Sequence, residues 1–298
     1  SEPRPGAMAE ALASAIRPTL YTLEGVRAAN EAASVRAGAQ PCPVHVKVDT
    51  GMHRVGASPD VAIEIARTVA RSPGLHLEGL WTHMAVAEEV DDPFSARQLE
   101  QFGDVVRRLS EEGISADITH AGNSAGAIAH PASRMDMVRC GIAIYGYAPS
   151  PGTASILADG SDDRLRPAMS LSAHVCHVQE LDAGERVSYG RRYAVSDKTV
   201  VATVPIGYAD GLPRRLFDAG GEVLIKGRRL PIAGAVTMDL IMVDCGPEAS
   251  VAVGDEVVLL GRQGANEIWA DDWARWLDTI SYEIVCGIGR RVPRVVSS

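Results

Sequence analysis

The alternation of strand-like and helix-like segments in the first half of the chain restricts its fold more than any other feature. Val44 to Val48 alternates as a strand does, and Ser58-Pro59 suits the start of a helix. Further strands are expected over 75–83 and 116–120, and helices over 8–16, 22–37, 59–71 and from Pro93 to near Gly113. Strand, loop and helix repeated in this order are typical of a parallel α/β fold.

Polar residues follow the predicted strands at the points where the strands end. They are Asp49 to Arg54, His83, Asn123-Ser124 and Arg139. In an α/β barrel the loops after the strands form the face that carries the active site. The pattern therefore predicts an α/β fold of the (β/α)8 TIM-barrel type, with its chemistry at this face.

The pattern changes after residues 150–167, a stretch rich in Pro, Gly, Ser and Asp that we interpret as a linker. A late helix is expected around 270–277. Further strands, separated by glycine-containing turns, are predicted over 170–181, 199–206, 222–226, 240–244 and 256–260. We therefore divide the chain into a partial α/β barrel domain over 1–160 and a mostly β C-terminal domain over 161–298.

Charge and composition argue against several classes of protein. The chain has 29 Lys and Arg against 38 Asp and Glu, a net charge of −9, which argues against a nucleic-acid partner. No apolar run approaches the roughly 20 residues needed to cross a membrane. Five scattered cysteines without a CxxC pair predict neither a disulfide framework nor a metal site, and they favour a cytoplasmic location.

Eight short motifs occur along the chain in a fixed order. They are Lys47-Val-Asp-Thr-Gly-Met-His-Arg54, Trp81-Thr-His83, His120-Ala-Gly-Asn-Ser124, Val138-Arg139-Cys-Gly-Ile142, Val187-Ser-Tyr189-Gly, Pro205-Ile-Gly-Tyr208-Ala-Asp-Gly, Thr237-Met238-Asp239 and Ile280-Ser-Tyr-Glu283. Together they resemble the alanine racemase family of pyridoxal 5′-phosphate (PLP) enzymes, which have fold type III. The resemblance implies a barrel followed by a C-terminal β domain, with PLP as cofactor.

Three residues correspond to catalytic groups of that family. The resemblance implies that Tyr189, supplied by the neighbouring subunit, is one of two catalytic bases and that His83 assists it. A phenol with its usual pKa near ~10 needs such help to act as a base at neutral pH. Arg139 would face the pyridine nitrogen of PLP. Because a guanidinium stays protonated, the ring would remain a weaker electron sink than one facing a carboxylic acid.

Other residues correspond to the substrate contacts of the family. Arg54 would bind the substrate carboxylate through two N–H groups, and Lys47 would support this arginine. Met238 would offer its backbone to the same carboxylate across a dimer interface. Tyr208 and Asp239 correspond to the substrate entryway.

The cofactor contacts follow from the same resemblance. Backbone N–H groups at the start of a helix suit a phosphate. The residues implied to hold the cofactor are Asn123, Ser124, Arg139, Gly141 and Ile142.

Each of these residues, taken alone, also has a plain structural interpretation. Tyr189 is compatible with a surface turn, and His83 with a hydrogen-bonded histidine of the core. Arg139 is compatible with an ion pair to Asp136, and Met238 with an apolar core. Only their order and combination favour the functional interpretation.

The chain departs from the family pattern in its lysines. The cofactor lysine of the family lies in a stretch resembling Val-Lys-Ala-Asn-Ala-Tyr-Gly, which does not occur here; the chain has Lys47, Lys198 and Lys226 alone. A complete barrel takes ~250 residues, more than precede the predicted β domain. We therefore expect an N-terminally truncated racemase that lacks the segment with the PLP lysine.

The leading prediction is a homodimeric isomerase with its sites at the subunit interface. It would interconvert L- and D-alanine through a PLP aldimine by a two-base mechanism, and so supply D-alanine for peptidoglycan. One alternative is a catalytically inert, truncated racemase-like module. Another is a broader-specificity amino-acid racemase, because Ala235 and Arg290 replace residues that are usual in the family. A PLP decarboxylase is disfavoured, since those enzymes lack the Ser-Tyr-Gly and Thr-Met-Asp motifs.

Overall fold

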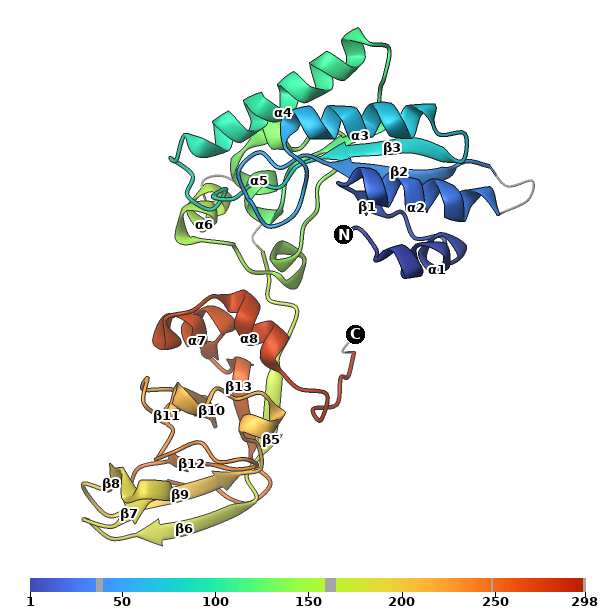
Figure 1. Cartoon of the computed structure of the whole chain (residues 1–298). Coiled ribbons are helices and arrows are strands. Elements are labelled where there is room, and N and C mark those ends of the chain that lie inside the picture. Colours follow the sequence, from blue (N-terminus) through green and yellow to red (C-terminus); the bar gives the residue numbers. More distant parts are fainter. Residues whose placement is uncertain (36–39, 159–164, 248, 297–298) are drawn as a thin grey trace. The chain divides into compact units, whose positions relative to one another are not determined.

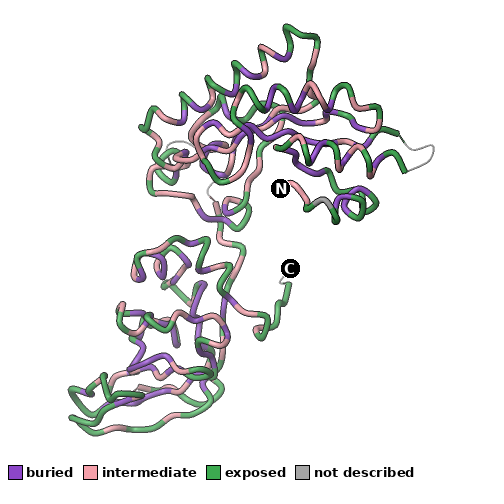
Figure 2. Tube along the Cα trace, viewed as in Figure 1, coloured by how far each residue is buried: buried purple, intermediate pink, exposed green. Residues whose placement is uncertain are grey.

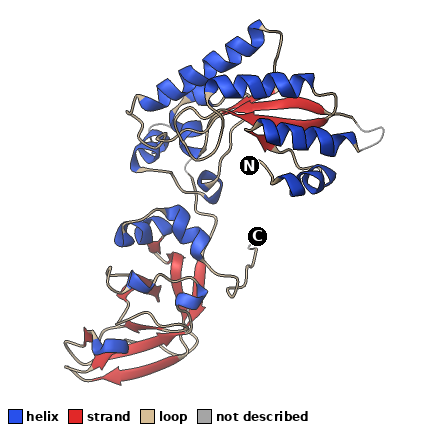
Figure 3. Cartoon of the chain, viewed as in Figure 1, coloured by secondary structure: helices blue, strands red, loops and turns tan. Residues whose placement is uncertain are grey.

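The structure, a computed structural model, describes residues 1–35, 40–158, 165–247 and 249–296. The chain divides into two compact units (Figure 1). The first comprises Ser1–Ile144 and Ala148–Leu165, and the second comprises Tyr145–Tyr147 and Arg166–Ser298. The predicted domain boundary between residues 160 and 161 lies outside the described residues. Helices are prominent in the first unit and strands in the second (Figure 3).

A parallel sheet forms the centre of the first unit, in the order β1-β2-β3-β4. Its strands are β1 (Thr19–Leu20), β2 (Cys42–Lys47), β3 (Leu75–Trp81) and β4 (Ile118–His120). The parallel order confirms the α/β prediction. Strand β1 was not predicted, because two residues are too few to show an alternating pattern.

Helices pack against this sheet and against one another (Figure 1). They are α1 (Met8–Ala13), α2 (Leu23–Ser34), α3 (Pro59–Arg71) and α4 (Phe94–Glu111). Pro59 stands at the first position of α3, and the apolar face of this helix buries Ile63 and Val69. Figure 2 shows the buried residues running along the sheet and the inner helix faces. Strand β2 is buried along nearly its whole length, as is usual in a parallel sheet covered by helices.

Two helices occur where the sequence predicted irregular chain. The small-residue turn after β4 leads into α5 (Ser124–Ala129), and the predicted linker contains α6 (Pro151–Ala158). The backbone N–H of Ser150 donates to the Thr153 hydroxyl (2.9 Å) and that of Thr153 to the Ser150 hydroxyl (3.2 Å), which stabilises the start of α6. The linker prediction is therefore wrong for residues 151–158, and its residues 159–164 lie outside the described part.

The second unit is mostly β, as predicted, and its strands form separate sheets. Strands β5 (Leu171–His174), β10 (Glu222–Ile225), β11 (Arg228–Pro231), β13 (Glu256–Gln263) and β14 (Asn266–Ile268) form one sheet. Strands β6 (His177–Leu181), β9 (Thr199–Val204) and β12 (Ile241–Asp244) form another, and β7 (Arg186–Val187) pairs with β8 (Tyr193–Ala194).

One predicted strand of the second unit is divided. Residues 170–181 form both β5 and β6, because the chain leaves the pairing with β13 and enters the pairing with β9. Helix α7 (Ala270–Leu277) was predicted, whereas α8 (Ser281–Gly287) was not. No helix of the described residues is long and apolar enough to span a membrane.

Candidate active site

The ends of three parallel strands bring Lys47, Trp81 and His120 side by side. The strand register pairs Lys47 with Trp81 and Trp81 with His120. The Lys47 Nζ lies 5.1 Å from the centroid of the Trp81 ring. The Trp81 ring stacks on His120, with 5.3 Å between centroids and 12° between planes. Because these are carboxyl ends of parallel strands, the residues lie at the face where the sequence predicted the site.

Arg139 is held at this face by four hydrogen bonds. Its Nη1 donates to His120 Nδ1 (2.7 Å). Its Nη2 shares its two hydrogens among three acceptors, the carbonyl oxygens of Thr82 (3.0 Å) and Ala121 (3.1 Å) and His83 Nδ1 (3.2 Å). The guanidinium carbon lies 4.5 Å from the Trp81 ring centroid. Burial lowers the pKa of Arg139 to about 10, so the guanidinium is charged at neutral pH.

The ion pair between Arg139 and Asp136 does not form. The Asp136 carboxylate instead accepts hydrogen bonds from the backbone N–H and the hydroxyl of Thr119, both at 2.7 Å. The plain interpretation of Arg139 is therefore wrong, and the guanidinium instead contacts His120 and His83.

Burial determines the charge of His83, and the contact with Arg139 determines its tautomer. Burial, followed by the nearby charges of Arg139, Arg54 and Lys47, lowers the pKa of His83 to about 4. His83 is therefore neutral at pH 7. Because a guanidinium can only donate, His83 Nδ1 accepts and its Nε2 carries the hydrogen. The Nε2 of the His83 ring is therefore a hydrogen-bond donor.

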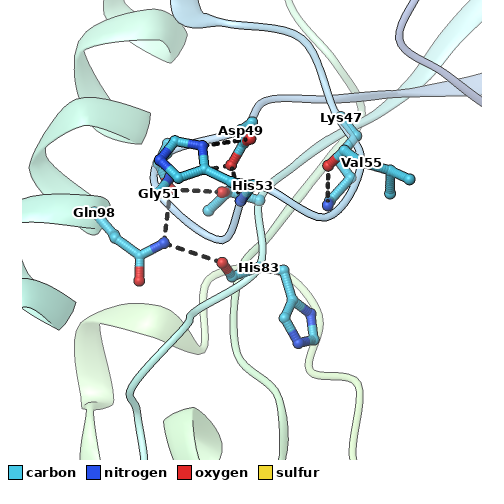
Figure 4. Close-up of polar contacts among 9 residues, drawn as sticks. Lys47, Asp49, Gly51, His53, Val55, His83 and Gln98 are labelled. Atoms are coloured by element: carbon cyan, nitrogen blue, oxygen red, sulfur yellow. Dashed lines mark hydrogen bonds and ion pairs between the residues drawn. The ribbon is translucent and has the colours of Figure 1, made fainter.

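Gln98 on α4 fixes the loops that follow β2 and β3 (Figure 4). Its Nε2 donates to the His83 carbonyl oxygen and to the Thr50 hydroxyl, both at 3.1 Å. Its Oε1 accepts from the Ala85 N–H at 2.9 Å. The His83 ring points away from this side chain. Gln98 is 1% exposed and was not predicted from the sequence, where it reads as one polar residue of a helix.

Replacing Gln98 with methionine is expected to lower the free energy of unfolding of the first unit by about 1–3 kcal/mol. The apolar side chain keeps the volume but leaves the Ala85 N–H and the His83 carbonyl without their partner. Urea unfolding measures the change. Gln101→Met, on an exposed position of the same helix, is the matched control and should leave the stability within about 0.5 kcal/mol. Equal stability of both variants would contradict the bridging role of Gln98.

The loop after β2 carries Arg54 and is closed by its own polar contacts (Figure 4). The Asp49 carboxylate accepts from the backbone N–H of Gly51 (3.1 Å) and of His53 (3.0 Å). The buried Lys47 Nζ donates to the Val55 carbonyl oxygen at 2.5 Å, next to Arg54. Burial and the charges of Arg54 and Arg139 lower the pKa of Lys47, while Asp49 opposes this shift. Arg54 itself is exposed.

The predicted cofactor residues after β4 lie together. The Ser124 hydroxyl accepts from the backbone N–H of Gly141 (2.9 Å) and of Ala143 (3.4 Å). A hydroxyl that accepts these bonds keeps its own hydrogen for donation. The Asn123 side chain is used differently, since its oxygen caps α5 by accepting from the Gly126 N–H at 2.8 Å.

Tyr189 belongs to the second unit, where it is 76% exposed. It follows Ser188, whose backbone angles, φ 66° and ψ −177°, lie in a region that is essentially restricted to glycine. The Ser188 hydroxyl donates to the Ala235 carbonyl oxygen at 2.8 Å, which helps to hold this turn. Backbone strain of this kind is concentrated at functional sites.

Tyr208, Met238 and Asp239 are brought together on two adjoining loops of the second unit. The backbone N–H of Tyr208 donates to the Thr237 carbonyl oxygen, and that of Ala209 to the Met238 carbonyl oxygen, both at 3.0 Å. Arg291 joins the same loops, because its Nη2 donates to Asp239 at 2.8 Å and its Nε lies 3.3 Å from an Asp210 oxygen. Met238 is exposed, which contradicts its interpretation as a core residue.

The substitution Gly207→Ala is expected to lower the free energy of unfolding of the second unit by about 1–3 kcal/mol. A Cβ at this position would lie 2.3 Å from the Thr237 carbonyl oxygen and 2.4 Å from that of Met238. These backbone atoms cannot yield without moving the loop. Gly287→Ala is the control, since its Cβ would meet only ordinary contact at 3.8 Å. Thermal unfolding compares the two, and equal melting temperatures would show that the loop yields freely.

Two aromatic residues of the site had no predicted role. Trp81 lies under both Lys47 and Arg139, and His120 accepts from Arg139. Both occur in motifs that the sequence analysis singled out. Trp81 and His120 are the last residues of adjacent parallel strands, and this position could have assigned both of them to the site.

Comparison with known proteins identifies both units. Residues 1–149 match the family model of the alanine racemase N-terminal domain, and residues 168–296 match that of the C-terminal domain. The alanine racemase of Symbiobacterium thermophilum is 47% identical over 84% of this chain, and that of Cutibacterium acnes is 40% identical over 97%. The chain spans 65% of the length of the first of these proteins and 75% of the second.

A solved structure agrees with these matches. The alanine racemase of Streptomyces coelicolor A3(2) superimposes with a TM-score of 0.89 and 36% identity, over 97% of this chain and 74% of the other. These matches confirm the prediction of an α/β barrel domain followed by a mostly β domain, in a family whose members depend on PLP. With both family domains matched, the chain belongs to the alanine racemase family, whose members are isomerases that interconvert L- and D-alanine.

Proposed function

We propose that the protein containing this chain interconverts L- and D-alanine with PLP as its cofactor, in the cytoplasm, and supplies D-alanine for peptidoglycan. The observation that carries the proposal is the arrangement around Arg139. This half-buried, charged guanidinium is oriented by hydrogen bonds to backbone carbonyls and to His120, and it contacts a neutral His83. Such an arrangement supplies both a fixed cation for a ring nitrogen and a proton donor beside it.

The residues after β4 fit the two ends of the cofactor. Ser124 accepts from two backbone N–H groups and retains a hydroxyl hydrogen, which suits a phosphate oxygen. We assign the phosphate to Ser124 with Gly141, Ile142 and Asn123, and the ring nitrogen to Arg139. When bound, PLP withdraws electrons from the α-carbon of the amino acid and so allows its proton to leave.

None of the chain's three lysines fits the covalent attachment of the cofactor. Lys47 donates to the Val55 carbonyl oxygen, Lys198 pairs with Glu180 at 2.6 Å, and Lys226 pairs with Asp255 at 3.1 Å. The proposal therefore assigns the attachment to no residue of these 298. The contacts of this chain are those that orient the cofactor and the substrate.

We assign proton transfer on the L-enantiomer to Tyr189 of a second copy of the chain. The outer N–H of the neutral His83 is a suitable donor to the tyrosine oxygen, and this bond would favour the ionised phenol. The high exposure of Tyr189 leaves it available to a partner subunit. A homodimer with its sites at the subunit interface follows from this assignment.

The substrate carboxylate is assigned to Arg54 and to the backbone of Met238. Arg54 is exposed, and its loop is fixed by Lys47. No described residue accepts a hydrogen bond from the Met238 backbone N–H, which leaves that donor for an anion. Tyr208 and Asp239 flank Met238 and are assigned to the path by which substrate enters.

The test uses the protein translated from the whole reading frame that contains this chain. Purified protein with PLP is expected to convert L-alanine to D-alanine, measured with a D-amino-acid oxidase assay, and to give no conversion after PLP is removed. Borohydride reduction followed by peptide mass mapping should locate PLP on a lysine other than Lys47, Lys198 and Lys226. Absence of both conversion and trapped PLP would favour the inert module over the racemase.

A further inference from the structure

A continuous series of hydrogen-bonded polar side chains, of which His120 and His45 are buried, extends from Arg139 away from the proposed cofactor. His120 accepts from Arg139 through Nδ1, and its Nε2 lies 3.0 Å from His45 Nδ1. The other nitrogen of His45, Nε2, lies 3.0 Å from Glu78 Oε2. Glu78 in turn accepts from the Arg17 Nε at 2.8 Å. This hydrogen-bonded series thus joins the proposed site to Arg17, a residue near the surface.

Two local features of the sheet make room for this series of side chains. The register pairs Val44 with Leu77 but His45 with Gly79, so Glu78 is an extra residue in β3. Such a bulge redirects a side chain, and here the carboxylate meets the imidazole of the neighbouring strand. A Cβ on Gly79 would lie 2.1 Å from His45 Nδ1, so the imidazole occupies the space above this glycine.

The two end groups of this hydrogen-bonded series, Arg139 and Glu78, determine the direction of every hydrogen bond between them. Arg139 can only donate, so His120 Nδ1 accepts and His120 Nε2 carries the hydrogen. That hydrogen is donated to His45 Nδ1, and His45 Nε2–H is donated to the Glu78 carboxylate. If His45 Nδ1 carried a hydrogen, His120 Nε2 would have to accept it, and the hydrogen of His120 would then be on Nδ1. There it would face the Arg139 donor. Both imidazoles therefore carry a hydrogen on Nε2 and none on Nδ1.

We propose that His120, His45 and Glu78 form a positioning relay that fixes the orientation of Arg139 toward the cofactor ring nitrogen. The inference rests on the proposed role of Arg139 and extends it to residues that do not touch cofactor or substrate. Its physical basis is that each member accepts a hydrogen bond from the preceding one. Removal of the final acceptor, Glu78, therefore means that the hydrogens of the two imidazoles are no longer fixed on Nε2.

The electrostatics of the relay agree with this geometry. Burial, then the charge of Arg139, lowers the pKa of His120 to about 3, so this ring stays neutral. Burial opposes the ionisation of Glu78, but hydrogen bonds from Arg17 and His45 outweigh it and keep its pKa below the usual range. The relay therefore ends on a carboxylate at neutral pH.

The first test is cofactor-independent and uses the ¹⁵N-labelled protein from the whole reading frame, without PLP. Long-range ¹H–¹⁵N spectra at pH 7 are expected to show His45 and His120 with a protonated Nε2 and a bare Nδ1. In Glu78→Leu, His45 is expected to show a substantial Nδ1–H population. Gly79→Ala, which displaces the imidazole without removing a polar group, should have the same effect. A wild-type Nδ1–H tautomer at either histidine, or unchanged tautomers in both variants, overturns the relay.

A matched control is available on the same strand. His76 on β3 pairs with Asp117 at 2.7 Å, and both side chains are exposed. Asp117→Leu removes the same kind of imidazole–carboxylate contact outside the relay. It is expected to change the signals of His76 and to leave those of His45 and His120 as in the wild type. Changed relay signals in this control would mean that the tautomers respond to general perturbation, which overturns the inference.

The second test measures function in the protein from the whole reading frame. Glu78→Leu is expected to lower kcat for racemisation about tenfold, with Asp117→Leu within twofold of the wild type. A kcat of Glu78→Leu within twofold of the wild type would overturn the positioning role. A wild-type protein without racemase activity would contradict the proposed function instead, and the tautomer spectra would then decide the relay alone.

Discussion

Tyr189→Phe is expected to slow the conversion of L- to D-alanine by about 10²–10⁴-fold, the usual contribution of a general acid–base group. The substitution removes the phenolic oxygen and keeps the ring. Tyr189 is 76% exposed, so the fold of its unit does not depend on it. PLP affinity should stay within about twofold of the wild type, because the cofactor contacts are assigned to Arg139, Ser124 and their neighbours.

Isotope exchange distinguishes this assignment from a general loss of activity. In a two-base reaction a second base acts on D-alanine and remains in Tyr189→Phe, so D-alanine should still exchange its α-hydrogen in D₂O. L-alanine should not. Proton NMR of the alanine α-hydrogen follows both reactions. Tyr145→Phe, another exposed tyrosine of the second unit, is the control and should retain full activity. Equal exchange of both enantiomers by Tyr189→Phe would refute its assignment as the base for the L-enantiomer.

The first unit is expected to lose stability as the pH falls from about 6.5 to about 4. His83 and His120 have native pKa values of about 4 and about 3, below the value near 6.5 of an unfolded histidine. In this interval the unfolded chain binds protons that the native unit does not. Stability is therefore complete above the unfolded pKa, and each histidine removes up to about 1.4 kcal/mol per pH unit below it.

Urea unfolding at pH 7, 5.5 and 4.5 measures this dependence, and the interval from pH 7 to 5.5 lies above the range in which most carboxylates titrate. The double variant His83→Gln with His120→Gln is expected to flatten the slope between these pH values. A wild-type stability that is constant from pH 7 to 4.5 would mean that these rings are protonated in the native state.

The long periodic elements and the location of the site were predictable from the sequence. Helices α3 and α4 show a clear apolar periodicity, and the polar residues after β2, β3 and β4 do lie at one edge of the sheet. The motifs also indicated Arg139 and His83, which the structure places in contact. The catalytic roles of these residues remain predictions.

The relay of histidines was not predictable, because it depends on pairing between strands. Nothing in the order of residues shows that Glu78 is extra in β3 or that His45 lies over Gly79; both depend on the register with β2. The helix α6 was missed for a related reason. Its start depends on mutual capping by Ser150 and Thr153, in a segment whose composition is typical of a loop.

The close approach of Gly79 to His45 has a consequence for how such chains vary. Since an added Cβ and the imidazole would occupy the same space, neither position can change freely while the other is kept. Related sequences with a larger residue at position 79 are expected to have lost the histidine at position 45. Those with glycine at 79 are free to retain it. The two positions should therefore covary, although they are far apart in the sequence. Glu78, the residue before this glycine, is 33 positions from His45.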